Sequence, residues 1–222
     1  MKTGKVSENK VGKSILKNTN SNDNKGAALN SSCAYLSQKE CLTGAVPGDA
    51  IVITKWIGLY GSVMIAKNCY EELRSRYPAF IMDDAIRFER YLSVDAEAKI
   101  AYELGERCMY ACGEGGLYAG LWNVTYTSGV GMSGYYKDIP IRQETVELCE
   151  FYDINPYKLR SEGSLIVVTS SPEELMKVYS DAGIPSSIIG YITEHKERIL
   201  IYGDEKKHIQ KPARDELCKV LW

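Results

Sequence analysis

Short apolar runs rich in β-branched residues are spread through this chain, and segments with helical patterns separate them. Residues 50–54 (AIVIT) and 165–169 (LIVVT) are continuous and apolar, which is typical of fully buried strands. Two further runs, residues 187–192 and 198–202, predict a pair of strands joined by the polar segment 193–197. This order of strands and helices constrains the fold more than any other feature of the sequence.

The segments between these strands carry apolar residues at helical spacing. The clearest helix start is Ser171-Pro172-Glu173-Glu174, which offers an N-cap serine, a proline at the first helical position and an acid at the third. Glycines predict a turn over residues 55–61 before the first helix. The predicted helices cover residues 62–76, 79–91, 96–104, 117–126, 142–152 and 172–182. This mixed order predicts an α+β fold with at least one helix-connected crossover.

The composition changes near residue 45. Residues 1–32 are rich in Lys, Asn, Ser and Gly, so they cannot bury enough apolar surface to offset the entropy lost on ordering. They form either a solvated tail or a basic arm for phosphates and other anionic surfaces. The whole chain has 222 residues, of which 45% are hydrophobic, and this is enough for one good-sized core. We predict a partly flexible segment over residues 1–46 and one domain over residues 47–222.

Charge and cysteine content exclude several classes of protein. The formal net charge is −2, from 27 basic and 29 acidic residues, so the chain lacks the global basic bias of a nucleic-acid-binding protein. The first residues are polar, unlike a secretory signal, and no apolar run approaches the ~20 residues that span a bilayer. Seven cysteines without a signal are typical of reduced thiols. We therefore expect a cytoplasmic protein that binds neither nucleic acid nor membrane.

Three glycine clusters are candidates for anion binding, because glycine permits tight turns and a helix N-terminus presents free N–H groups. The first contains Gly58 and Gly61 in a strand–turn–helix pattern. The second, residues 113–116 (GEGG), also opens a predicted helix, and the third, residues 161–164 (SEGS), precedes a buried strand. None fits a P-loop or a dinucleotide fingerprint. Each cluster is therefore either a phosphate-binding turn or an ordinary turn.

Several segments resemble, in order, the C-terminal domain of the aminoimidazole ribonucleotide (AIR) synthase-related superfamily. The Thr-Lys-Trp-Ile-Gly signature at residues 54–58 is similar to the hydrogenase maturation factor-like subgroup. The resemblance implies a mixed sheet flanked by helices, and it implies that the preceding ATP-binding domain is deleted, with residues 1–46 as its remnant. The matching segments are PGDAIVITKWIGLYG (47–61), GEGGLYAGLWNVTYTSGVG (113–131), IPIRQETVELCEFYDINPYKL (139–159), SEGSLIVV (161–168) and IIGYIT (188–193).

The resemblance also implies which residues would lie on the phosphate side of an ATP site. Tyr110 and Ala111 stand where relatives carry His and Asp, and Tyr60 stands where relatives carry Glu. The Asp residues that hold Mg²⁺ in relatives belong to the missing domain. We therefore expect no cofactor and no metal site in this chain alone, or ATP and Mg²⁺ held together with a partner, and we assign no catalytic residue. The phosphate-side residues are Gly58, Gly61, Glu114, Gly115 and Gly116.

Cysteine and histidine offer weaker candidates. Cys108 and Cys112 are four residues apart, but a structural zinc site needs four ligands, so buried or free thiols are the alternative. Relatives that make a cyanide group use a cysteine at the extreme C-terminus. Cys218 is near the end of this chain, but further residues follow it, and the apolar residues of 217–222 instead predict a helix that docks on the body or on a partner. His195 and His208 are expected at the surface.

These observations predict a degenerate family member that is a non-catalytic binding or assembly subunit. Loss of the N-terminal domain would expose an apolar face, which a homodimer contact or a full-length relative would cover. The alternative is an ATP-dependent enzyme that activates an amide or carbamoyl oxygen. In that case a partner subunit would complete the site for ATP and Mg²⁺.

Overall fold

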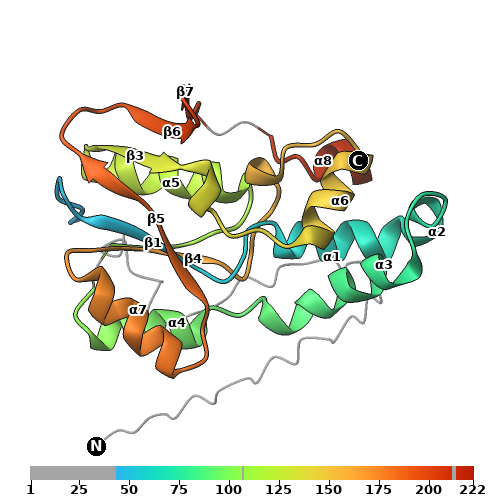
Figure 1. Cartoon of the computed structure of the whole chain (residues 1–222), viewed down its shortest axis with the longest axis horizontal. Coiled ribbons are helices and arrows are strands. Elements are labelled where there is room, and N and C mark those ends of the chain that lie inside the picture. Colours follow the sequence, from blue (N-terminus) through green and yellow to red (C-terminus); the bar gives the residue numbers. More distant parts are fainter. Residues whose placement is uncertain (1–43, 107, 212–213) are drawn as a thin grey trace, which may run out of the picture. The chain divides into compact units, whose positions relative to one another are not determined.

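The computed structural model describes residues 44–106, 108–211 and 214–222, so the predictions for residues 1–43 lie outside the described part of the chain. Within these residues the chain forms a seven-stranded sheet with the order β2-β4-β1-β5-β3-β6-β7 (Figure 1). Neighbouring strands are antiparallel except β3 and β6, which run parallel. The strands are β1 (Ala50–Thr54), β2 (Cys108–Ala111), β3 (Gly131–Tyr135), β4 (Leu165–Thr169), β5 (Ser186–Thr193), β6 (Arg198–Tyr202) and β7 (Glu205–His208).

Helices cover both faces of the sheet, which explains the continuous apolar runs. In β1, Ile51 and Ile53 pack with the helix on one face, whereas Val52 packs with the helices on the other. Every residue of β1 and β4 is buried, as expected for strands without a solvent-facing side. The α+β prediction of a mixed sheet flanked by helices is therefore confirmed. The covering helices are α5 (Gly116–Ser128) on the first face, and α4 (Asp95–Glu103) and α7 (Pro172–Asp181) on the second.

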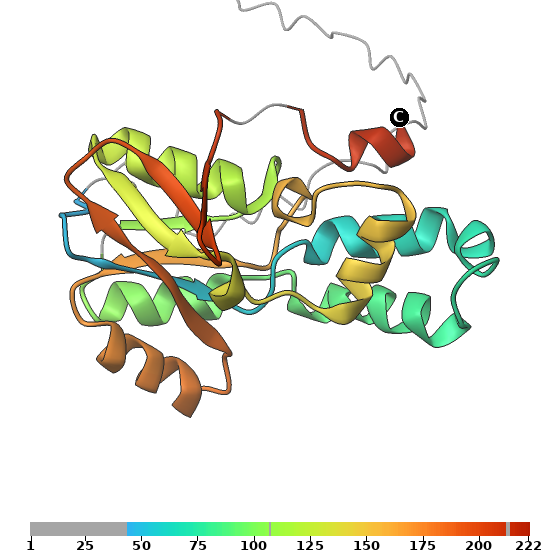
Figure 2. The same ribbon diagram turned by 45° about the horizontal axis from the view of Figure 1, so that its top comes forward.

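A second apolar cluster lies beside the sheet, where the remaining helices gather (Figure 2). Leu59, Leu148, Leu159 and Leu217 are all buried in it. The terminal helix therefore docks on the body, as the apolar tail predicts. None of the described helices is long and apolar enough to cross a membrane. The helices here are α1 (Leu59–Asn68), α2 (Tyr70–Leu73), α3 (Ala79–Ile86), α6 (Gln143–Phe151) and α8 (Cys218–Leu221), with the 3-10 turns η2 (Arg87–Tyr91), η3 (Tyr136–Asp138) and η4 (Pro156–Lys158) between elements.

The predicted pairing of residues 187–192 with 198–202 is wrong, because β3 lies between β5 and β6. The sequence of β3, GMSGY, has low strand propensity, so no periodic pattern reveals it. Its glycines are needed for close packing. A Cβ on Gly131 would lie 1.8 Å from the His195 carbonyl oxygen, and a Cβ on Gly190 of β5 would lie 2.4 Å from that of Ser133. The exposed edge strand β7, EKKH, likewise has no apolar pattern.

The helix boundaries also differ from those predicted. The first helix begins at Leu59 rather than residue 62, because Gly58 adopts a left-handed conformation (φ 73°) and starts the helix directly. The predicted helix over 62–76 is interrupted at Cys69, and that over 79–91 becomes a 3-10 turn at Arg87. Ser171 takes the N-cap position of α7, but its side chain makes no capping hydrogen bond with the described residues.

A buried ion pair ties the end of β1 to α4. The Lys55 residue is 6% exposed and has a positive φ of 54°. Its Nζ lies 2.5 Å from Glu97 Oε1 and donates hydrogen bonds to the carbonyl oxygens of Tyr91 and Ser93 at 2.9 and 2.6 Å. Burial lowers the pKa of Lys55, and the Glu97 carboxylate opposes that shift. The ion pair and the two carbonyl hydrogen bonds therefore offset part of the cost of keeping both charges in this interior.

We expect Lys55→Met to lower the free energy of unfolding by about 3–5 kcal/mol, because it leaves the Glu97 carboxylate buried without a partner. Methionine keeps the Cβ, so the backbone strain of the positive φ is unchanged. The double variant with Glu97→Met should recover part of the loss. Lys67→Met is the control, since the Lys67–Glu89 pair is exposed and its removal should cost less than about 1 kcal/mol. Equal losses for both lysines in urea unfolding would contradict this role.

Candidate functional site

Two helices open with a glycine in the left-handed conformation, and both begin beside the segment 157–161. Gly58 (φ 73°) precedes α1 and Gly115 (φ 77°) precedes α5. Glycine adopts this conformation without a steric penalty, so the helices begin abruptly and their first N–H groups point out of the helix end. Whether a phosphate could bind here depends on which groups already accept hydrogen bonds from these N–H donors.

The N–H groups of the two glycines in the first cluster are already bound by the chain itself. The Gly58 N–H donates to Ser161 Oγ at 2.8 Å, and the Gly61 N–H donates to the Arg160 carbonyl oxygen at 2.9 Å. A Cβ on Gly61 would lie 2.4 Å from Leu159 Cγ, so only glycine leaves room for that buried leucine. Packing against Leu159 therefore accounts for Gly61, whereas the left-handed φ of Gly58 and the Thr145 Cγ2 atom, 2.8 Å from a Cβ built there, account for Gly58.

Gly116 in the second cluster meets the same segment from the other side. It has a positive φ of 64°, and a Cβ here would lie 2.6 Å from the Leu159 carbonyl oxygen and 2.7 Å from that of Tyr157. Close contact with backbone atoms leaves no space for a ligand at this position. The phosphate roles of Gly58, Gly61 and Gly116 stay predictions, and their presence needs no ligand to explain it.

The N-terminus of α5 is held by a carboxylate from the C-terminal tail. Asp215 is buried, and its Oδ2 accepts the Gly115 N–H at 2.6 Å. Its Oδ1 accepts the N–H groups of Leu217 at 2.8 Å and Arg160 at 3.3 Å. Burial raises the pKa of Asp215, while these three N–H donors favour the charged form. An internal anion therefore occupies the end of α5, where positive partial charge accumulates.

Arg160, which donates its N–H to Asp215, forms an ion pair with Glu162 through its side chain. Arg160 Nε lies 2.7 Å from Glu162 Oε1, and the guanidinium lies over the ring of Tyr60 at 4.8 Å. Burial raises the pKa of Glu162, which Arg160 opposes. The Glu162 Oε2 atom is buried and has no hydrogen-bond partner among the described residues. Sequence reasoning singled out residues 161–164 as a glycine turn but not this pair.

A cleft of about 470 Å³ lies along α5 next to its N-terminus. Glu114 is exposed there, and the two predicted residues Glu114 and Gly115 border the cleft, whereas the other three predicted glycines do not. Asn123 in its wall donates to the Tyr110 hydroxyl at 2.9 Å, so Tyr110 has a structural partner. The lining residues are Glu114, Gly115, Ala119, Trp122, Asn123, Tyr126 and Lys211.

Three of the five described thiols are buried, whereas Cys69 and Cys218 are partly exposed. Burial raises the pKa of Cys108 to about 11 and those of Cys112 and Cys149 to about 12, so all three stay protonated near neutral pH. No group of three or more His, Cys, Asp or Glu side chains in the described residues could hold a metal ion. His195 and His208 are exposed, as predicted.

We expect Gly116→Ala to destabilise the protein more than Gly129→Ala. Both glycines have positive φ, 64° and 71°, so each substitution should cost about 1–2 kcal/mol of backbone strain. Only Gly116 faces the segment 157–161, whereas no described atom lies within 4 Å of a Cβ on Gly129. Overpacking should therefore add about 1–3 kcal/mol for Gly116→Ala. Urea unfolding measures both, and equal costs would show that the segment yields without strain.

Known proteins share this architecture. Carbamoyl dehydratase HypE of Azotobacter vinelandii is 26% identical over 168 residues, which cover 70% of this chain and 45% of the relative. The crystal structure of HypE from E. coli, a hydrogenase maturation protein, matches with a TM-score of 0.64 at 15% identity, over 81% of this chain and 54% of that chain. A HypE–HypF complex matches with a TM-score of 0.60 at 25% identity, over 77% and 55%. This chain spans about half the length of these proteins.

A sequence family matches most of the domain. Its model covers residues 46–203, which contain all the strands of the sheet except β7 and all five segments that carry the resemblance. The chain therefore belongs to the family of the AIR synthase related protein, C-terminal domain.

Proposed function

We propose that this chain is a non-catalytic binding or assembly subunit of its family. The observation that carries the proposal is the Asp215 carboxylate at the N-terminus of α5. The Gly115 N–H, a donor that could otherwise face a phosphate, is bound to Asp215 Oδ2 at 2.6 Å. A phosphate placed there would meet a negative charge instead of a free donor, and the two would repel each other.

The charges around the cleft also disfavour a nucleotide phosphate. Among the described residues that line the cleft, Lys211 is the single cationic one, and Glu114 is an acid at its edge. Phosphate groups need Mg²⁺, several basic side chains or both. Trp122 and Tyr126, in contrast, are the kind of aromatic residue that is enriched at protein interfaces. The cleft is therefore better suited to a protein surface than to ATP.

A partner subunit has a precedent among the relatives, because HypE has been crystallised in a complex with HypF. In this chain Tyr126 is 69% exposed on α5, beside the half-buried Trp122. Burial of such aromatic surface is a main source of affinity in interfaces. We propose that a second copy of this chain or a full-length relative covers this surface.

Light scattering of the protein alone, and of its mixture with a purified full-length relative, tests this proposal together with calorimetry of Mg²⁺-ATP binding. We expect a mass above that of the monomer in at least one sample and no ATP binding by this chain alone. Tyr126→Ala should weaken the association about tenfold or more. Tyr135→Ala, at an exposed tyrosine on β3, is the matched control. A monomer in both samples, or micromolar ATP binding by the chain alone, would contradict the proposal.

A second candidate is an ATP-dependent enzyme whose site a partner completes, and the Arg160–Glu162 pair favours it. Burial raises the pKa of Glu162, so a proton on this carboxyl is held to higher pH than on a free glutamate. Arg160 keeps part of its guanidinium exposed, where an anion could meet it. Such a pair could stabilise and protonate an oxygen that leaves with phosphate.

The enzyme candidate predicts ATP hydrolysis that appears only when this chain is mixed with a full-length relative. Glu162→Gln should remove at least about 99% of that activity, since general acid–base groups contribute about 10²–10⁴-fold. The mass of the complex should not change. Lys137→Gln, at an exposed lysine that lies over the ring of Tyr135, is the control. If the intact complex shows no hydrolysis above that of the relative alone, the enzyme candidate fails and the assembly role stands.

A further inference from the structure

Four tyrosines from four separate elements line a second cavity, of about 310 Å³, which shares no residue with the cleft beside Glu114. Tyr118 comes from α5, Tyr136 from η3, Tyr157 from η4 and Tyr202 from the end of β6. Asn155 and Lys207 complete the lining. Ligand pockets in proteins commonly have volumes of about 300–1,000 Å³, so the cavity has room for a small ligand of one or two rings.

Three of these rings support one another and form a firm wall. The rings of Tyr118 and Tyr157 stack at 5.8 Å between centroids, and Tyr136 meets Tyr157 nearly edge-on at 4.9 Å. The hydroxyls of Tyr118 and Tyr136 lie 2.5 Å apart. These rings also pack on the apolar core of the sheet, so the fold alone explains them. Tyr202 and Lys207 are not part of the apolar clusters, so the packing of the core does not explain their positions.

Tyr202 is 67% exposed, although its ring contacts that of Tyr136 at 6.4 Å between centroids. An exposed aromatic ring at the rim of a pocket offers a stacking surface to a planar ligand. The other three tyrosines are half-buried. The cavity therefore has a wall of packed aromatic rings and an accessible aromatic rim, and this arrangement suits a ligand with a planar ring.

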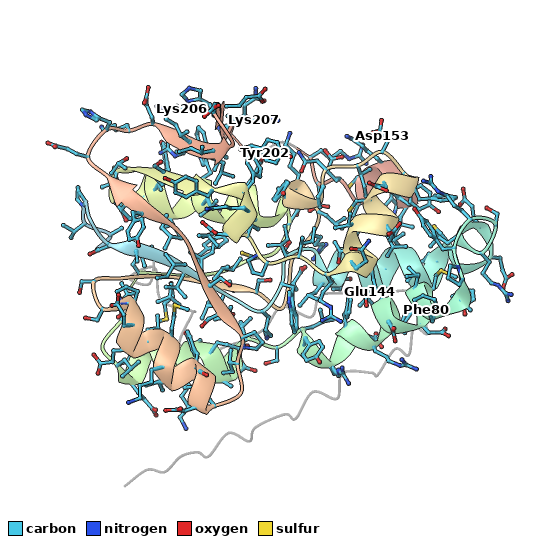
Figure 3. All side chains as sticks on the ribbon, viewed as in Figure 1. Phe80, Glu144, Asp153, Tyr202, Lys206 and Lys207 are labelled. Atoms are coloured by element: carbon cyan, nitrogen blue, oxygen red, sulfur yellow. The ribbon has the colours of Figure 1, made fainter. Side chains whose placement is uncertain are left out.

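The register of the β6–β7 hairpin places a positive charge beside this rim. Leu200 pairs with Lys207 and Tyr202 pairs with Glu205, so Lys207 and Tyr202 lie on the same face of the hairpin. Lys206 pairs with Ile201 and lies on the opposite face. Figure 3 labels Tyr202, Lys206 and Lys207 on this hairpin. Lys207 forms no salt bridge with a described residue, and none of the described residues that line the cavity is acidic.

We propose that this cavity binds a small planar aromatic ligand that carries a negatively charged group. The ring stacks on Tyr202, and the anionic group pairs with Lys207. Asn155 accepts the Tyr157 N–H through its Oδ1, which leaves its side-chain NH₂ to donate to the ligand. This proposal does not depend on the assembly role, because the cavity and the cleft have separate walls.

Calorimetry with two planar aromatic anions that are not nucleotides, 2-aminobenzoate and indole-3-carboxylate, tests the proposal on the full chain. Each should bind at least about tenfold more tightly than the same ring without the anion, aniline or indole, and than the anion without the ring, acetate. At least one of the two anions should bind, since they differ in size. Nuclear magnetic resonance of the ligand should show saturation transfer from tyrosine ring protons.

Two pairs of variants locate the binding. Tyr202→Ala should weaken binding about tenfold, a typical loss for removal of a stacking ring, and Lys207→Ala should weaken it about tenfold through loss of the ion pair. Tyr191→Ala, at an exposed tyrosine on β5, and Lys206→Ala, on the other face of the hairpin, should not change it. The proposal is overturned if neither anion binds, if ring or anion alone binds equally well, or if all four variants bind alike. Circular dichroism confirms that each variant is folded.

Discussion

The arrangement of the domain depends on the contacts that the segment 157–161 makes with the starts of two helices. Its central residue, Leu159, is fully buried and fills the space that glycine leaves at Gly61. Ser161 Oγ accepts the Gly58 N–H and donates to the Leu159 carbonyl oxygen. The same carbonyl lies against Gly116. One short segment therefore contacts the N-termini of both α1 and α5: the side chain of Leu159 lies against Gly61, and the backbone of the segment lies against Gly116.

The C-terminal tail completes this arrangement through two carboxylates. Asp215 bridges the N–H groups of Gly115 and Arg160, so it joins the start of α5 to the same segment. Glu216 Oε2 accepts the Asn155 N–H at 3.4 Å and lies 2.5 Å from Lys219 Nζ. Negative groups near a helix N-terminus interact favourably with its partial positive charge. The tail therefore belongs to the structure of the candidate site and is not a simple extension from it.

The sequence predicted the strands and helices that a short pattern of neighbouring residues identifies. Residues 50–54 and 165–169 form the expected strands because both faces are covered, and Gly58 and Gly115 do open helices. The strand β3 could not be predicted, because its glycines reflect the closeness of the neighbouring strands and not strand propensity. The hydrogen bonds of the candidate site could not be predicted either, because they join residues that are far apart in the sequence. Gly115 meets Asp215 and Gly58 meets Ser161 across about a hundred residues of sequence, and no periodic pattern records such contacts.

The helix α5 connects the two surfaces for which binding is proposed. Its residues Ala119, Trp122, Asn123 and Tyr126 follow helical spacing along the cleft, whereas Leu117, Leu121 and Val124 face the sheet. Tyr118 takes a third direction, into the tyrosine cavity. Because the start of α5 is held by Leu159 and Asp215, both surfaces inherit their geometry from those contacts. In the described part of the chain the N–H groups of Gly58, Gly61 and Gly115 are bound by the chain's own atoms, and for this reason we propose recognition rather than phosphate chemistry for these surfaces.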